Sequence, residues 1–187
     1  MADPARRAAT YDDILALPPH VTGQILFGVL HAHPRPAPRH ANAATTLSEL
    51  LAPPFRRGRG GPGGWLILFE PELHLGEHVI VPDLAGWRRE RMPEMPIDKA
   101  YFVLSPDWVC EVLSPSTAPI DRGDKLKVYA AFDVKHVWFV DPEARTLEIL
   151  ERDPKGYRVL EVFSGEAKIR AAPFDAIELE LGLLWQR

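Results

Sequence analysis

Two carboxylates stand in or beside runs of apolar residues that predict buried strands. Glu111 lies inside WVCEV, and Asp83 follows HVIVP. Burying an ionised carboxylate costs on the order of several kcal/mol unless it is paired, protonated or bound to a metal. Carboxylates at neighbouring strand ends suit a hard cation such as Mg²⁺ or Mn²⁺, which one or two carboxylates commonly hold. The pattern favours a metal site at Asp83 and Glu111, with the backbone carbonyl of Val112 as a further oxygen.

A third chemical group follows on a predicted helix. Asp121, Lys125 and Tyr129 recur at four-residue steps and therefore share one helix face. If this face turns toward the strand ends, the Lys125 ammonium can orient a water or stabilise negative charge on a phosphate, with Asp121 and Tyr129 as supports. Each residue also has an ordinary structural interpretation. Asp83 can close a turn, Glu111 can pair with an arginine, and Lys125 can be a solvated residue paired with Asp121.

The segments around these residues predict a mixed β-sheet flanked by helices. Short helices are expected in YDDILALP, near residues 39–52 with a stop at Pro53, and from a cap at Asp121 to about Phe132. The stretch HPRPAPRH predicts extended loop, and RRGRGGPGG predicts a flexible basic loop. Strands are expected in GQILFGVLHA, WLILFEPELHL, HVIVPDLAGW, WVCEVLS, HVWFVD, TLEILER and GYRVLEVF.

The composition fits one ordinary globular domain over residues 1–187, with its core at about 10–185. The chain is 46% hydrophobic and 26% charged, and no apolar run is long enough to span a bilayer, which favours a cytoplasmic protein. The single cysteine, Cys110, is predicted to be a small buried hydrophobe. The net charge of −4 gives no overall attraction for nucleic acid, so binding DNA would require a local basic surface.

The amino-acid sequences of three segments resemble one protein family. VIVPDLAGW, DWVCEVLSPST and DRGDKLKVYAAFDVKHVWFVDPEARTLEIL are similar to the Uma-two family of restriction-endonuclease-like proteins, in the PD-(D/E)XK nuclease superfamily. The resemblance implies a restriction-endonuclease-like α/β fold and metal-dependent hydrolysis of phosphodiester bonds. By position it makes Asp83 the Asp of the PD motif and Glu111 the acid of the EVLSPST motif. The superfamily lysine usually stands where this chain has Leu113, and Lys125 is the matching lysine on the following helix.

Three positions bear on how far the resemblance transfers. The early family segment usually carries an acid where this chain has Gln24, which brings no charge and is expected to lower metal affinity. A glycine usually follows the crossover helix where this chain has Asp133, a poorer residue for a left-handed helix end. His40 matches a histidine often found there, and is interpreted as a phosphate contact, with a capping or packing role as the alternative.

These observations lead to two hypotheses of different classes. The first is a Mg²⁺- or Mn²⁺-dependent endonuclease acting on DNA, with a homodimer as one way to cut both strands. The second is a catalytically silent nuclease-fold module that binds nucleic acid or a protein partner, which the missing acid at Gln24 supports. Two arginine clusters, 56–59 and 88–91, are either DNA contacts or solvated loops. The HAH motif at 31–33 lacks the further ligands that a zinc site needs.

Overall fold

The central element is a six-stranded sheet in the order β10-β9-β8-β7-β6-β3. The structure, a computed structural model, describes residues 7–34 and 36–186. Neighbouring strands are antiparallel except for β7 and β8, which are parallel. The strands are β3 (Trp65–Phe69), β6 (Leu84–Arg88), β7 (Trp108–Val112), β8 (His136–Asp141), β9 (Thr146–Asp153) and β10 (Gly156–Ser164). The predicted mixed sheet is therefore confirmed.

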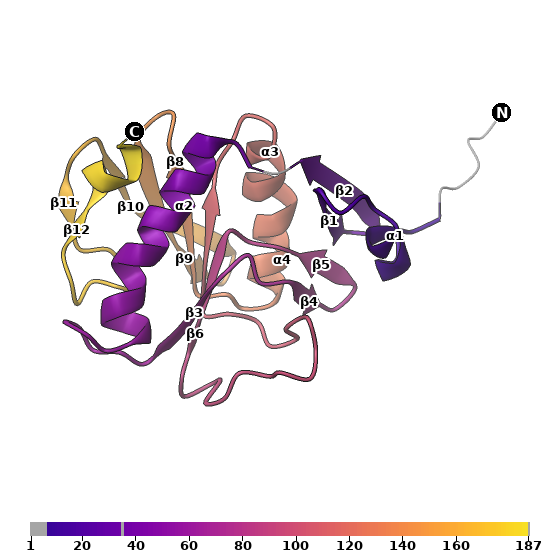
Figure 1. Cartoon of the computed structure of the whole chain (residues 1–187), viewed down its shortest axis with the longest axis horizontal. Coiled ribbons are helices and arrows are strands. Elements are labelled where there is room, and N and C mark those ends of the chain that lie inside the picture. The colour runs from indigo at the N-terminus through magenta and orange to yellow at the C-terminus, as the bar shows by residue number, and fades with distance from the viewer. Residues whose placement is uncertain (1–6, 35, 187) are drawn as a thin grey trace.

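One helical crossover joins the two parallel strands, as parallel pairing requires. It consists of α3 (Ala118–Ile120), the π-helical turn η2 (Asp121–Lys125) and α4 (Leu126–Ala131), which follow one another without a break (Figure 1). The predicted end near Phe132 is confirmed, because Phe132 is the C-cap residue. The predicted cap at Asp121 is wrong. Thr117 is the N-cap, so Asp121 lies inside the helical segment with its side chain buried.

Helices cover both faces of the sheet, so β7 is buried on both sides. The hydrophobic cluster on one face includes Cys110 and Val112 together with residues of α2 (Pro38–Leu51) and the C-terminal segment. The cluster on the other face includes Val109 together with Val128 and Tyr129 of α4. This explains the nearly continuous apolar run of β7. Because side chains alternate along a strand, Glu111 shares the face of Val109 and points toward α4. Cys110 is fully buried, as predicted.

A smaller sheet, in the order β2-β1-β5-β4, stands beside the large one (Figure 1). The strand structure expected in GQILFGVLHA is a hairpin of β1 (Val21–Leu26) and β2 (Val29–Pro34), and β5 (His78–Ile80) pairs with both β1 and β4 (Leu73–Leu75). Helix α1 (Tyr11–Leu15) precedes the hairpin. The chain closes with β11 (Lys168–Ile169), β12 (Leu179–Glu180) and the short helix η3 (Leu181–Trp185). Within the described residues, no helix has the length and hydropathy to cross a membrane.

Two predicted boundaries around α2 need correction. The proline-rich stretch is not loop throughout, because β2 runs to Pro34 and α2 begins at Pro38, where a missing N–H costs no hydrogen bond. Helical structure also continues past Pro53 as a π-helical turn, η1 (Ala52–Arg56). The following basic loop is tied down rather than freely extended, since the backbone N–H of Arg59 donates to the Pro53 carbonyl at 2.8 Å.

Candidate active site

Asp83 connects three elements at the beginning of β6. One carboxylate oxygen, Oδ2, accepts the backbone N–H of Val112 in β7 at 2.7 Å. The other oxygen, Oδ1, lies 2.6 Å from Nε2 of His40, in the first turn of α2. Burial lowers the pKa of His40, but the hydrogen bond to Asp83 and its negative charge outweigh burial and hold that pKa above its ordinary value. Asp83 therefore does more than close a turn, because it fixes α2 and β7 relative to β6.

Glu111 finds its compensation on the crossover helix. Its Oε2 lies 3.0 Å from Nζ of Lys125, and its Oε1 accepts the hydroxyl hydrogen of Tyr129. The Glu111 side chain is only 1% exposed. Burial raises the pKa of Glu111 to about 8, against the opposing pull of the Lys125 charge. The alternative of an arginine partner is wrong, since a lysine and a tyrosine bind this carboxylate.

Lys125 is the centre of a buried charge cluster. Its Nζ is also 3.0 Å from Oδ1 of Asp121, and it donates to the Val81 carbonyl at 3.4 Å. Burial lowers the pKa of Lys125, but Glu111, Asp121 and Asp83 together raise it above its ordinary value, so the ammonium stays charged. Lys125 is 5% exposed, which contradicts the interpretation as a solvated helix residue. The predicted pairing of Lys125 with Asp121 is confirmed.

The predicted shared face of Asp121, Lys125 and Tyr129 is also confirmed, because all three contact the same charge cluster. Asp121 and Lys125 bracket the π-helical turn η2, which widens the helix where it meets β7. Such turns often occur at functional sites. The start of this helix is held by Ser114 of the EVLSPST motif, whose Oγ accepts the backbone N–H of Thr117 at 3.3 Å. The motif therefore both supplies Glu111 and positions the helix that carries Lys125.

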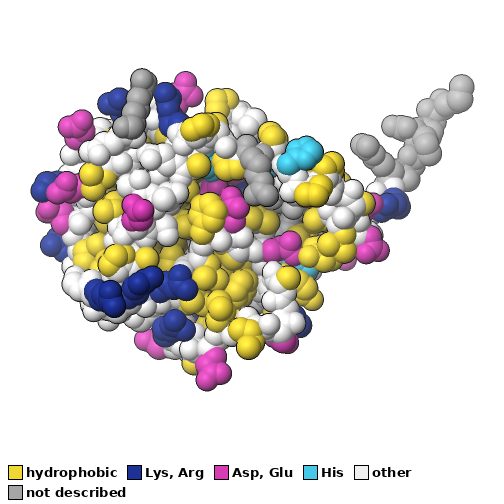
Figure 2. Space-filling model, in the orientation of Figure 1, with side chains coloured by type: hydrophobic (Ala, Val, Ile, Leu, Met, Phe, Trp, Pro, Cys, Tyr) yellow, Lys and Arg dark blue, Asp and Glu magenta, His cyan; other side chains and the backbone are white. Residues whose placement is uncertain are grey.

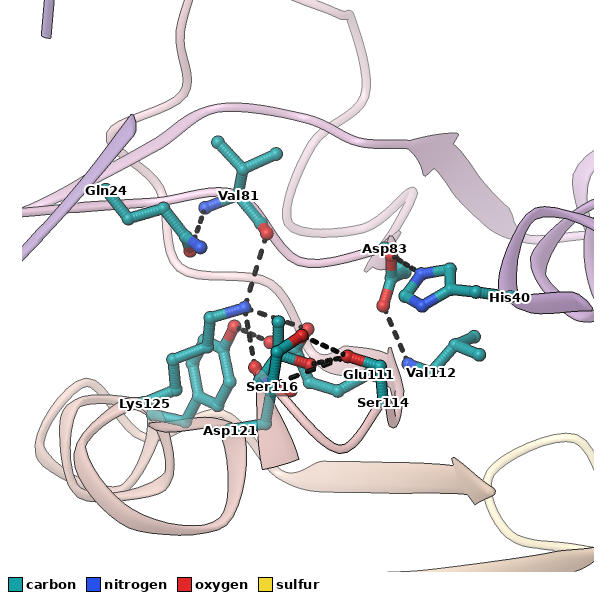
Figure 3. Close-up of polar contacts among 12 residues, drawn as sticks. Gln24, His40, Val81, Asp83, Glu111, Val112, Ser114, Ser116, Asp121 and Lys125 are labelled. Atoms are coloured by element: carbon teal, nitrogen blue, oxygen red, sulfur yellow. Dashed lines mark hydrogen bonds and ion pairs between the residues drawn. The ribbon is translucent and has the colours of Figure 1, made fainter. Parts of the chain in front are cut away.

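Gln24 supports the site through the backbone rather than through charge. It is 6% exposed, and its Oε1 accepts the backbone N–H of Val81 at 3.0 Å. The carbonyl of the same residue, Val81, accepts the hydrogen bond from Lys125. Gln24 thus braces the segment that Lys125 contacts. Figure 3 shows these residues beside Asp83 and His40, which lie on the other side of the site.

The Asp83–His40 pair and the charge cluster around Lys125 line one cavity of about 320 Å³. Its walls include Gln24, His40, Val81, Asp83, Glu111, Asp121 and Lys125. They also include His33, which the sequence had suggested only as half of a zinc motif. The His33 Nε2 is buried and has no hydrogen-bond partner among the described residues. Cross-strand pairing would have indicated this residue, because Thr22, two residues before Gln24 on the same face of β1, pairs with His33.

The donor set suits Mg²⁺ or Mn²⁺ better than a closed structural metal site. Asp83 and Glu111 supply carboxylate oxygens, and a hard cation of this kind takes its other ligands from water and substrate phosphate. Within the described residues, no three His, Cys, Asp or Glu side chains are grouped to hold a metal. The use of the Val112 carbonyl stays a prediction; the contact made by Val112 in the structure is that of its N–H with Asp83.

Comparison with known proteins supports this assignment of the fold. Residues 10–182 match the Uma2 family, which is described as "Putative restriction endonuclease". The chain belongs to the Uma2 family. Among solved structures it is similar to a protein from Anabaena variabilis titled a putative nuclease belonging to DUF820, with 21% identity and a TM-score of 0.75. The match covers 95% of this chain and 97% of the other, which shows a shared restriction-endonuclease-like fold. No curated protein matches the Uma2 chain described here.

Proposed function

We propose that this Uma2 protein is a Mg²⁺- or Mn²⁺-dependent endonuclease that hydrolyses phosphodiester bonds in DNA. The observation that carries the proposal is the convergence of Asp83, Glu111 and Lys125 from two strands and a helix on one cavity. Membership of a family described as "Putative restriction endonuclease" supports it independently. A bound hard cation would supply Lewis-acid polarisation of the phosphate and activation of a water.

The chain's own residues then have distinct roles in this proposal. Asp83 and Glu111 hold the cation, with the Val112 carbonyl as a further oxygen. Lys125 places a fixed positive charge inside the cavity, where it orients the attacking water or stabilises charge on the phosphate as that charge develops. Asp121 and Tyr129 fix the positions of Lys125 and Glu111 through the contacts described above.

Two further residues act as supports. His40 orients Asp83 through the 2.6 Å contact of its Nε2, and its other ring nitrogen is available to a substrate phosphate. Gln24 holds Val81 and contributes no charge to the cation. Each of these roles acts through geometry, so its loss is expected to misplace the catalytic groups rather than abolish folding.

A second function is favoured by the same residue, Gln24. If the missing early acid leaves the site too weak to hold a cation, the protein is a catalytically silent nuclease-fold module that binds nucleic acid or a protein partner. The Lys125 and Tyr129 contacts already satisfy Glu111 without a metal. In that case the buried cluster would be structural.

A cleavage assay distinguishes the nuclease from the silent module. Supercoiled, linear and single-stranded DNA are incubated with Mg²⁺, Mn²⁺ or chelator, using wild type, Asp83→Ala and Glu111→Ala purified identically. We expect metal-dependent cleavage by wild type alone. Cleavage that survives in both variants would refute the assigned site. Absence of cleavage in every sample, together with no heat of metal binding by calorimetry, would refute the nuclease proposal in favour of the silent module.

A further inference from the structure

Two arginine clusters that are about thirty residues apart in the sequence lie side by side in the fold. The first cluster is at the end of η1 and in the loop before β3, and consists of Arg56, Arg57 and Arg59. The second is at the end of β6 and just after it, and consists of Arg88, Arg89 and Arg91. Strand pairing joins them, because Trp65 of β3 lies opposite Arg88 of β6. The backbone N–H of Arg89 donates to the Gly64 carbonyl at 2.9 Å. We call the six arginines the basic surface.

Most of this charge is unpaired. Arg91 is neutralised by the buried Asp107 at 3.0 Å, whereas the other five arginines form no ion pair with the described acidic residues. Glu90 lies between Arg89 and Arg91 in the sequence, but within residues 7–34 and 36–186 it forms no ion pair with any of the arginines. The six arginines carry +6 in a chain of net charge −4, so the remaining residues sum to −10. A concentration of positive charge on an otherwise acidic protein indicates a polyanionic partner.

The backbone beneath the surface is held in place. Arg59 and Gly63 donate backbone hydrogen bonds to the carbonyls of Pro53 and Pro54, both at 2.8 Å. Gly61 packs so closely on Pro54 that an added Cβ would lie 2.4 Å from the proline Cβ. The Arg88 guanidinium lies 4.1 Å from the centre of the Trp65 ring, so the aromatic face holds it in position. A rigid base reduces the entropy lost when arginine forks bind phosphates.

The basic surface lies at the opposite end of β6 from the candidate active site. Asp83 and Arg88 are five residues apart, which at about 3.3 Å per residue separates their backbones by roughly 16 Å. Figure 2 shows a row of Lys and Arg side chains close to the C-terminal end of α2, where the chain enters β3. Roughly 16 Å is less than the rise of about 34 Å of one turn of a DNA duplex, so a single duplex can contact both sites.

We propose that the basic surface binds the phosphate backbone of DNA within one helical turn of the phosphate that occupies the active-site cavity. This rests on the proposed function for the position of the cleaved phosphate, but binding itself does not require cleavage. Guanidinium groups recognise phosphates and carry no base-specific information here, so this surface provides affinity and register rather than sequence choice. A substrate too short to reach it is expected to bind weakly.

The first test is DNA binding in chelator, which prevents metal-dependent cleavage. Fluorescence anisotropy with a 30-base-pair duplex compares wild type, the triple variant R56Q/R57Q/R59Q and a control, K135Q/R170Q/K155Q, which removes the same charge from exposed positions elsewhere. Losing three phosphate contacts should lower affinity by on the order of 100-fold near 0.1 M salt and reduce the salt slope by about 3. The control should change little, and circular dichroism checks that both variants fold.

The second test places the surface on the DNA. Cys110 is the only cysteine and is buried, so a cysteine introduced by Arg57→Cys can carry a photo-crosslinker alone. We expect crosslinks to DNA from position 57 and none from a Lys155→Cys control. Equal binding by the triple variant and wild type, no DNA binding by wild type, or capture of an acidic protein instead of DNA would overturn the inference.

Different results would refute the proposed DNA contact of the basic surface and the proposed nuclease activity. Unchanged binding by the arginine variant, with cleavage still abolished by Glu111→Ala, would refute the basic surface and leave the nuclease proposal standing. Arginine-dependent binding without any cleavage and without any heat of metal binding would support the basic surface and refute the nuclease proposal.

Discussion

Replacing Lys125 by methionine tests whether the buried charge cluster depends on this one cation. The substitution keeps much of the side-chain volume but leaves Glu111 and Asp121 in a site where all three side chains are at most 5% exposed. Both carboxylate oxygens that lose their partner are 3.0 Å from Nζ. At pH 9, above the Glu111 pKa of about 8, the substitution leaves ionised carboxylates buried without compensation, and removing one member of a buried ion pair in this way costs about 3 to 5 kcal/mol of the free energy of unfolding.

Lys127 provides the matched control on the same helix. Its ammonium lies 2.9 Å from Asp124, a similar distance, but the two side chains are 69% and 41% exposed. Water screens such a pair, so Lys127→Met should cost less than about 0.5 kcal/mol. The contrast between the two lysines isolates burial as the cause, since helix position and residue type are alike.

Urea unfolding followed by tryptophan fluorescence measures both variants, because Trp87, Trp108 and Trp138 are fully buried and report loss of the core. The double variant Lys125→Met/Glu111→Gln should recover part of the loss, since it removes one of the two stranded charges while Asp121 remains. A Lys125→Met cost no larger than that of Lys127→Met would refute the reasoning. It would mean that Glu111 is tolerated in β7 without this lysine.

Three other predictions follow from single residues. Asp133 has a φ of 55°, so Asp133→Gly should raise the free energy of unfolding by about 0.5 to 1 kcal/mol, and an unchanged or lower urea midpoint would contradict this. His78 accepts the Phe27 N–H through Nδ1, and burial lowers its pKa, so the folded state binds fewer protons. Stability should therefore fall as pH drops below about 6.5, and His78→Gln should flatten that fall in urea titrations at pH 7.5 and 5.5. Gln24→Glu should tighten Mn²⁺ binding in calorimetry by adding a carboxylate to the cavity, and unchanged affinity would show that position 24 does not face the cation.

The sequence by itself determined the elements and the identity of the acidic residues. A run such as WVCEV, apolar at nearly every position, favours a strand covered on both faces, and β7 is such a strand. Four-residue spacing placed Asp121, Lys125 and Tyr129 on one face because helix geometry is local. Boundaries were less certain where prolines occur, since Pro38 and Pro53 fit helical positions that do not need their N–H.

Only the tertiary structure decided which groups meet. His40 contacts Asp83 from 43 residues away, and Lys125 rather than an arginine compensates Glu111. The pairing of His33 with Thr22 places His33 at the cavity. The pairing of β3 with β6 brings the two arginine clusters together on one surface. Hydrophobic periodicity reports which side of an element is buried, but it contains no information on the neighbour that buries it. The partner of a charge is therefore set by topology, which long-range packing determines.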